Sequence, residues 1–325
     1  MILLTGGTGF VGSHVLQRLH AEGAQVRCLV RPKAGRTLDA ASMDAAEVAP
    51  GDLETGAGLQ EALAGVETVV HLAGVTKAVW RDEYYDGNVR ATANLLVAMA
   101  GSNARLVHVS SLAAIGPAES VQRPVNDETE PHPLTHYGRS KLEGERLVRA
   151  SRPDAVIVRP PVVYGPRDTD VFQVLKPIAR GWSLTMSGGE RWFSTIYVSD
   201  LAAGLSGLAV SQAGAGGTYY LAHEQPASWS GLAACAARIM GVRLRTVRIP
   251  PPLARAVGAC AEAWSYIAGQ PSIISREKVA EGLCRAWICE TAKARAELGF
   301  TAQTDLDHGL AETLAWYKEA GWLSY

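Results

Sequence analysis

The sequence predicts an α/β protein with a doubly wound parallel sheet and a smaller, mixed C-terminal lobe. Short apolar runs alternate with stretches of helical periodicity through the first half of the chain, which is typical of a parallel sheet flanked by helices. The chain also opens with an apolar run, a glycine-rich turn and a helical pattern, over residues 2–22. This order indicates a Rossmann-type nucleotide-binding domain.

The glycine-rich turn follows the first strand directly and spans residues 5–12, with the sequence TGGTGFVG. Gly6 permits a tight turn, Gly9 allows the backbone to approach a pyrophosphate, and Gly12 lets the helix pack closely on the strand. The helix that begins here directs its positive dipole end at the phosphates. We therefore expect a dinucleotide against Gly6, Gly9, Phe10, Val11 and Gly12.

The remaining elements follow in order. Strands are predicted at residues 25–30, 66–72, 105–110, 155–158 and 218–221. Helices are predicted near 10–22, 57–64, 82–100, 136–150, 199–210, 228–240, 252–268, 275–282 and 305–320. Since no repeat or low-complexity linker separates two halves, we expect two lobes packed on one another. Residues 1–165 would form the main NAD(P)-binding domain, with 193–222 returning to it, and residues 166–192 and 223–325 most of a substrate lobe.

Composition limits the possible partners. The 31 lysines and arginines nearly balance the 32 aspartates and glutamates, so no strong field attracts nucleic acid. The five cysteines are scattered without a Cys-x-x-Cys pair, so we expect reduced thiols and no metal site. No stretch is apolar enough to span a bilayer, and the first strand begins without a leader segment. We expect a cytoplasmic enzyme with a small-molecule substrate.

Three polar residues predict the chemistry. Tyr137 and Lys141 are four residues apart in a predicted helix and share one of its faces. An ammonium group lowers the pKa of a nearby phenol, which then exchanges a proton with an alcohol or ketone oxygen. Ser111 follows the strand at 105–110, at the sheet edge where open α/β folds bind ligands. Ser110 and Ser111 could instead only cap the strand; we favour Ser111 as functional and Ser110 as structural support.

Together these segments resemble one family, the extended short-chain dehydrogenases/reductases, also called the NAD-dependent epimerase/dehydratase superfamily. The resemblance covers nearly the whole chain. It rests on residues 5–12, Asp52-Leu53, His71-Leu72-Ala73-Gly74, Asn88, Ser111, Tyr137, Lys141, residues 159–166, residues 196–201 and residues 297–300. It implies that Asp52 contacts adenine, that residues 71–74 line the cofactor, and that Lys141 also holds the nicotinamide ribose. The implied cofactor contacts beyond the glycine turn are Asp52, Leu53, Leu72, Ala73, Gly74, Lys141, Pro161 and Val163.

The end of the second predicted strand indicates the cofactor. Enzymes that use NAD usually carry an acidic residue there, which accepts hydrogen bonds from the ribose hydroxyls. This chain has Arg31, which can pair with a 2′-phosphate and stack on adenine. Lys33 and Arg36 add positive charge nearby. We therefore expect NADP(H), with NAD(H) as the alternative.

Departures from the family pattern narrow the reaction. Ser111 is followed by Leu112 and Ala113, which cannot move protons, so a sugar dehydratase is disfavoured. The arginine that holds diphosphate in sugar-binding relatives is shifted here to Arg191, which weakens a nucleotide-sugar clamp. The last third resembles the branch of 3β-hydroxysteroid dehydrogenases and dihydroflavonol reductases, although Glu290 replaces its usual aspartate. Its nearly uncharged helix at 252–268 would either line the substrate site or form part of the core of the small lobe. The candidate substrate contacts are Trp80, Tyr164 and Arg191.

We therefore predict an NAD(P)-dependent oxidoreductase that moves hydride at an alcohol or ketone carbon of a small, apolar substrate. A nucleotide-sugar 4-epimerase with tightly bound NAD is the first alternative. A non-catalytic NADP sensor is the second, although the intact Ser111, Tyr137 and Lys141 argue against it.

The resemblance also implies a homodimer that pairs through the helices bearing Asn88 and Tyr137. Asn88 would either support the catalytic residues or be a simple helix-face amide. Apolar surface for that interface would come from Leu95, Leu96, Ala98 and Met99.

Overall fold

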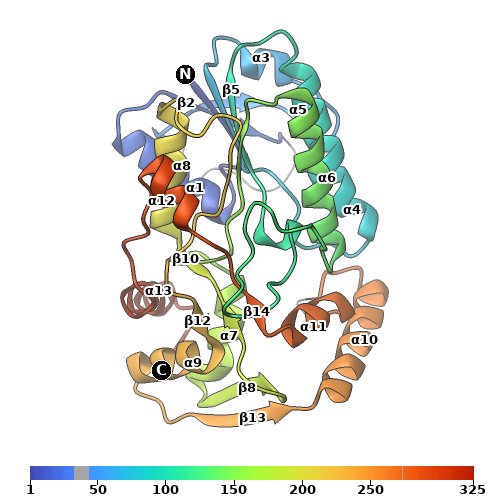
Figure 1. The fold of residues 1–325 in the computed structure, drawn as a ribbon, viewed down its shortest axis with the longest axis vertical. Coiled ribbons are helices and arrows are strands. Elements are labelled where there is room, and N and C mark those ends of the chain that lie inside the picture. The colour runs from blue at the N-terminus through green and yellow to red at the C-terminus, as the bar shows by residue number, and fades with distance from the viewer. Residues whose placement is uncertain (33–43, 273) are drawn as a thin grey trace.

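The computed structural model describes residues 1–32, 44–272 and 274–325. Its main sheet has seven parallel strands in the order β11-β6-β5-β4-β1-β2-β3 (Figure 1). The strands are β1 (Ile2–Thr5), β2 (Val26–Val30), β3 (Glu47–Pro50), β4 (Thr68–His71), β5 (Arg105–Val109), β6 (Val156–Val158) and β11 (Thr218–Tyr219). The strand order reverses at β1, and this switch point is where doubly wound sheets bind ligands. The predicted fold class is confirmed.

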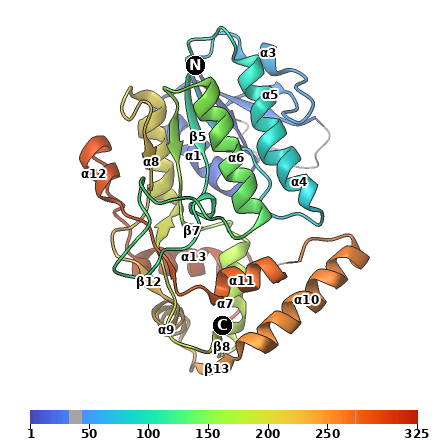
Figure 2. The same cartoon turned by 45° about the vertical axis from the view of Figure 1, so that its right-hand side comes forward.

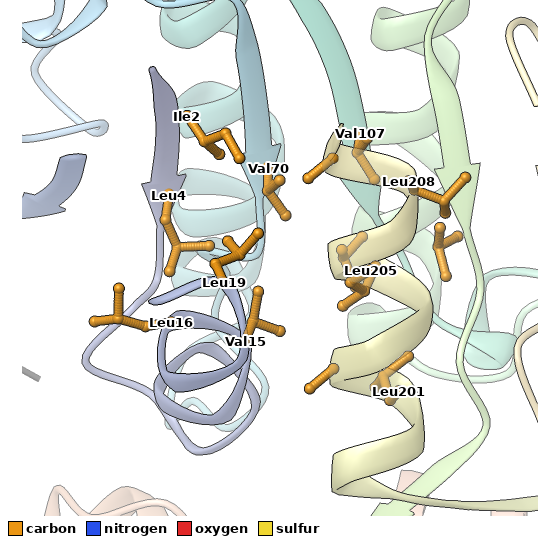
Figure 3. Packing of buried hydrophobic residues seen from close by; sticks show 14 of the residues in the cluster. Ile2, Leu4, Val15, Leu16, Leu19, Val70, Val107, Leu201, Leu205 and Leu208 are labelled. Atoms are coloured by element: carbon orange, nitrogen blue, oxygen red, sulfur yellow. The ribbon is translucent and has the colours of Figure 1, made fainter. Parts of the chain in front are cut away.

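Helices cover both faces of this sheet. On one face, α1 (Phe10–Ala21) and α8 (Val198–Val210) bury Val15, Leu16, Leu201 and Leu205 against the strands (Figure 3). The other face carries α3 (Leu59–Leu63), α5 (Ala91–Ala98) and α6 (His136–Ser151). Because both faces are covered, β1, β4 and β5 are buried along their whole length.

The helix predicted at 82–100 is interrupted. It consists of α4 (Arg81–Tyr85), a π-helical turn η1 (Asp86–Arg90) and α5. A Cβ on Gly87 would lie 2.3 Å from Val75 Cγ2, so glycine allows the loop after β4 to approach this turn. The expected apolar surface of the helix is mostly absent. Its members Leu95, Leu96 and Met99 are buried in the sheet core, because the sheet supplies their packing partners.

The smaller lobe is mixed. Its helices are α7 (Asp170–Ala179), α9 (Trp229–Met240), α10 (Pro251–Ala268), α11 (Arg276–Leu283) and α13 (Leu306–Glu319). Helix α12 (Ala292–Leu298) instead packs on the core of the main sheet, near α8 (Figure 1). A parallel ribbon joins β8 (Trp182–Met186) to β13 (Arg245–Ile249), and β7 (Val162–Tyr164) pairs with β10 (Thr195–Tyr197). A third small sheet contains β9 (Trp192–Phe193), β12 (Ala227–Ser228) and β14 (Ala286–Trp287). The sequence does not predict α7, β8 or β13. Among the described residues, no helix is long and apolar enough to cross a membrane.

Candidate active site

The glycine turn forms a tight cradle between β1 and α1. Gly6 has a φ of 78°, and a Cβ on it would lie 2.7 Å from the amide nitrogen of Ala73. A Cβ on Gly12 would lie only 2.1 Å from the Gly6 carbonyl oxygen. No side chain caps α1, whose first turn contains Phe10 and Val11, so its leading amides are available to an anion. The cradle therefore fits a dinucleotide diphosphate.

The adenine end of the cradle contains an ion-pair cluster that the sequence does not predict. Arg31 Nη2 donates to Glu54 Oε1 at 2.9 Å, and Arg31 Nε lies 3.7 Å from Asp52 Oδ1. Asp52 also accepts a hydrogen bond from the backbone of Glu54 at 2.8 Å. Leu53 is buried in the sheet core. Lys33 and Arg36 lie outside the described residues. Two carboxylates therefore compete with a phosphate for the Arg31 guanidinium.

Polar contacts hold the loop after β4 in place. Thr5 Oγ1 accepts a hydrogen bond from Ala73 N at 3.2 Å and contacts His71 Nδ1 at 2.7 Å. Asn88 is buried; its side chain exchanges two 2.9 Å hydrogen bonds with the backbone of Val75 and donates to Ser140 Oγ at 2.9 Å. Asn88 therefore ties the cofactor loop to α6. This geometry favours the supporting role for Asn88 over a simple helix-face amide.

Ser111, Tyr137 and Lys141 meet where β5 ends and α6 begins. The Ser111 hydroxyl accepts a hydrogen bond from Ala113 N at 3.1 Å, at the start of the 3-10 turn η2 (Leu112–Ala114), and it lies near enough to the Tyr137 phenol to lower the pKa of that group. A Cβ on Gly138 would lie 2.3 Å from the Ala113 carbonyl oxygen, so glycine lets α6 approach η2 closely enough for this contact.

Lys141 is buried one helical turn further on, and its Nζ donates to the Val109 carbonyl at 2.7 Å. A Cβ on Gly74 would lie 3.7 Å from that Nζ, so the ammonium faces the cofactor loop. Ser110 Oγ is buried and has no hydrogen-bond partner in the described part of the chain. Pro160, beside the predicted contact Pro161, accepts a hydrogen bond from Leu112 N at 2.9 Å.

The electrostatics of the phenol differ from the sequence-based expectation. Burial raises the pKa of Tyr137, and the Ser111 hydrogen bond offsets this only in part. Burial also lowers the pKa of Lys141, to about 8, against the opposing effect of Glu145. Lys141 Nζ is bonded to the Val109 carbonyl, and its effect on the phenol stays a prediction. Lys278 of α11 is a cation that lowers the pKa of Tyr137. The Tyr137 phenol therefore keeps its proton at neutral pH.

Helix α11 and Tyr84 complete the surroundings of Tyr137, and the sequence does not predict them as site residues. The Glu277 carboxylate accepts two hydrogen bonds, at 2.9 and 3.0 Å, from His136 N at the start of α6. Lys278 Nζ donates to Glu281 Oε2 at 2.7 Å. The Tyr84 ring centroid lies 6.3 Å from that of Tyr137. Periodicity predicts the helix but gives no signal that it packs on a segment about 140 positions earlier.

The three candidate substrate contacts have different surroundings. Trp80 is exposed, and its ring lies 5.1 Å from that of Tyr266 on α10. Arg191 donates to the carbonyls of Met186 at 2.9 Å and Ser187 at 3.1 Å, so it braces its own loop. Tyr164 is buried in the core of the small lobe and donates to the Asp305 carbonyl at 3.3 Å. Backbone carbonyls accept hydrogen bonds from the Tyr164 hydroxyl and the two Arg191 Nη groups, whereas Arg191 Nε has no partner in the described part of the chain. The roles of both residues as substrate contacts stay predictions.

A comparison with known families agrees with this site. The model of the NAD dependent epimerase/dehydratase family matches residues 2–222. The chain belongs to this family. It is therefore an enzyme, and the family supports an NAD-dependent oxidoreductase.

Individual relatives cover almost the full length. A ceramide reductase of Caulobacter vibrioides is 32% identical over 99% of this chain and 96% of its own length. An N-acetyl-alpha-D-glucosaminyl-diphospho-ditrans,octacis-undecaprenol 4-epimerase of Escherichia coli O157:H7 is 28% identical over 96% of this chain and 94% of its own. The solved structure of MoeE5 with UDP-glucuronic acid and NAD superposes with a TM-score of 0.75 at 25% identity, over 98% of this chain and 99% of that one.

Proposed function

We propose that the protein interconverts a ketone and an alcohol on an apolar, lipid-like substrate, with Ser111, Tyr137 and Lys141 as its catalytic residues. The observation that carries this proposal is the close packing of α6 on η2, which brings Tyr137 to Ser111 beside the buried ammonium of Lys141. These groups lie at the carboxyl ends of the parallel strands, next to the dinucleotide cradle.

Each side chain has a defined role in the reducing direction. Ser111 donates a hydrogen bond to the substrate carbonyl oxygen and places that oxygen at the phenol. Tyr137 is protonated at neutral pH because burial raises its pKa, so it donates the proton that the developing alkoxide requires. Lys141 binds the ribose through its ammonium. The nicotinamide, when bound, supplies the hydride.

The substrate class rests on two observations. Both Nη groups of Arg191, the candidate diphosphate clamp, donate to backbone carbonyls of its own loop. The two relatives named above act, by their names, on ceramide and on an undecaprenol-linked sugar, and both of these are lipids. We infer a substrate with a long apolar portion.

Cofactor turnover tests the proposal directly. With excess 2-dodecanone dispersed in detergent, we expect one NADPH to be oxidised for each alcohol formed, at a higher rate than with cyclohexanone. A 4-epimerase would instead interconvert UDP-glucose and UDP-galactose with no net oxidation of cofactor. Tight NADPH binding without turnover of any ketone would favour a sensor and contradict the proposal.

We propose NADP(H) as the preferred cofactor, with NAD(H) accepted less well. The Arg31 ion pairs are partly exposed, and such pairs contribute about 0–1 kcal/mol, so a 2′-phosphate can displace the carboxylates. Arg31→Ala should weaken NADPH binding by about 1–3 kcal/mol and spare NADH. Glu54→Gln should instead strengthen NADPH binding a few-fold, because it frees the guanidinium. Fluorescence titration with both cofactors measures each effect.

Glu47 provides a matched control for that titration. Glu47 of β3 pairs with Arg27 of β2, the strand that precedes Arg31, at 2.8 Å, so Glu47→Gln removes a similar carboxylate away from the cradle. We expect this variant to bind both cofactors like the wild type. Equal losses of NADPH and NADH affinity in Arg31→Ala would show that Arg31 does not recognise the phosphate.

Assembly, domain division and location complete the proposal. We propose a cytoplasmic homodimer that pairs through α5 and α6, where Val97 stays exposed. Light scattering at micromolar concentration should give twice the chain mass of 34.5 kDa.

We also propose a division into two domains. Residues 1–165 with 193–222 would hold the cofactor, and residues 166–192 and 223–325 would supply most of the substrate lobe.

A further inference from the structure

Helix α10 exposes an apolar stripe along its whole length. Leu253, Val257, Cys260, Trp264 and Ile267 follow one another at spacings of four and three residues, which places them on one face. All five are exposed, including 68% of Trp264 and 78% of Ile267. Figure 2 shows α10 at the outer edge of the small lobe.

A different face of α10, next to the stripe, packs against the protein. Ala254, Gly258 and Ser265 are buried. A Cβ on Gly258 would lie 2.8 Å from Val279 Cγ2 of α11, so the two helices are in close contact. The helix is therefore fixed in place by one face, while its apolar stripe has no partner within the described chain.

The segment that contains this stripe is strongly positive. Residues 241–276 carry five arginines and one glutamate, a net charge of +4, whereas the whole chain carries −1. The glutamate, Glu262, pairs with Arg276 at 3.8 Å. Arg243, Arg248 and Arg255 have no carboxylate within 4 Å in the described part of the chain. The charge of this segment is therefore complementary to an anionic surface.

A hollow beside α10 adds a site of suitable size for an anionic group. It measures about 390 Å³ and lies between α10 and α11, lined by Arg255, Arg276, Ala280 and Leu283. Two guanidinium groups at a concave surface are well suited to a phosphate ester. Exposed tryptophan and tyrosine are typical of the interface between lipid head groups and acyl chains.

We propose that α10, together with the arginines of residues 241–276, binds the surface of an anionic phospholipid membrane. The stripe of Leu253, Val257, Cys260, Trp264 and Ile267 enters the head-group region, as amphipathic interfacial helices do, and the arginines contact lipid phosphates. A second copy of the chain fits this surface less well, because two patches of charge +4 would repel each other.

The surface on α10 also lies on a route by which the substrate could reach the active site. This inference about the route rests on the proposed function. Tyr266, at the end of α10, contacts Trp80, which precedes α4. On α4, Tyr84 in turn faces Tyr137. Two aromatic pairs, Tyr266 with Trp80 and Tyr84 with Tyr137, thus lie between α10 and the phenol, and an apolar ketone dissolved in the membrane would pass them on its way to the site.

Vesicle sedimentation tests the membrane surface without any turnover. We expect the wild-type chain to bind vesicles of phosphatidylcholine with one-third phosphatidylglycerol, to bind pure phosphatidylcholine at least tenfold more weakly, and to dissociate as salt is raised. Trp264→Ser/Ile267→Ser and Arg248→Ala/Arg255→Ala should each lower the binding constant at least tenfold. All four positions are exposed, so the fold should persist, and circular dichroism checks this.

Val210→Ser is the matched control, because Val210 is a similarly exposed apolar residue on the distant helix α8. It should bind vesicles like the wild type. The proposal is overturned if the wild type does not bind anionic vesicles, or if Trp264→Ser/Ile267→Ser binds them equally well. A loss of mass by light scattering in that variant would assign the stripe to a second copy, and would also overturn it. Vesicle binding without ketone turnover would reject only the proposed function.

Discussion

Tyr137→Phe is expected to lower turnover by a factor of about a hundred to ten thousand while leaving NADPH affinity unchanged. The ring keeps its contact with Tyr84, but the proton that burial retains on the phenol is lost. Without that proton, the alkoxide formed by hydride transfer must take one from water. Single-turnover oxidation of bound NADPH, with affinity measured by titration, separates the two effects.

Tyr84→Phe is the matched control for this prediction. Its hydroxyl accepts a hydrogen bond from Ala78 N at 3.2 Å and has no role in the proposed reaction, so turnover should change little. Ser111→Ala should slow turnover and spare cofactor affinity, whereas Lys141→Ala should lower both. Near-normal turnover in Tyr137→Phe would show that the assigned mechanism is wrong.

Local features of the fold and site were predictable from the sequence. The turn at Gly6 and Gly12 needs glycine because backbone atoms lie within 3 Å of any Cβ, and this requirement appears in the spacing itself. The four-residue spacing of Tyr137 and Lys141 likewise sets their common helix face. Such features depend on residues that are close to one another in the sequence.

Features that depend on tertiary contacts were not predictable in the same way. Arg31 suggests a free phosphate-binding cation, but Glu54 reaches it from the loop after the next strand. A cation that lowers the pKa of Tyr137, Lys278, comes from a helix about 140 residues later. Periodicity assigns residues to a face of a helix but does not say which other element packs there, so both pairings appear only in the structure.

The same limit applies to the helix predicted at 252–268. Its apolar composition suggested either a substrate lining or a packed core helix. In the structure α10 packs through small residues, Ala254 and Gly258, and its larger apolar side chains point outward. The apolar composition of this helix therefore predicted burial correctly only for its small residues, and not for the larger apolar side chains of the stripe.

The buried ion pair behind the site should dominate its stability. Arg159 donates to both carboxylate oxygens of Glu145, at 2.9 and 2.6 Å, and to the Tyr220 hydroxyl at 2.9 Å. Both charged side chains are buried. Glu145→Gln leaves the Arg159 charge without its counter-ion, and the loss of one partner from a buried pair costs about 3–5 kcal/mol. Urea unfolding should therefore show a large drop in the free energy of unfolding.

Glu145→Gln should also change the pH dependence of cofactor binding. Glu145 raises the pKa of Lys141, which burial otherwise lowers, to a net value of about 8. Without the carboxylate this pKa falls further, so Lys141 loses its proton, and NADPH affinity declines, at a lower pH than in the wild type. Glu119→Gln, in the exposed pair with Arg123 at 2.9 Å, is the control and should alter neither property. If Glu145→Gln unfolded at the same urea concentration as this control, the pair would not stabilise the site.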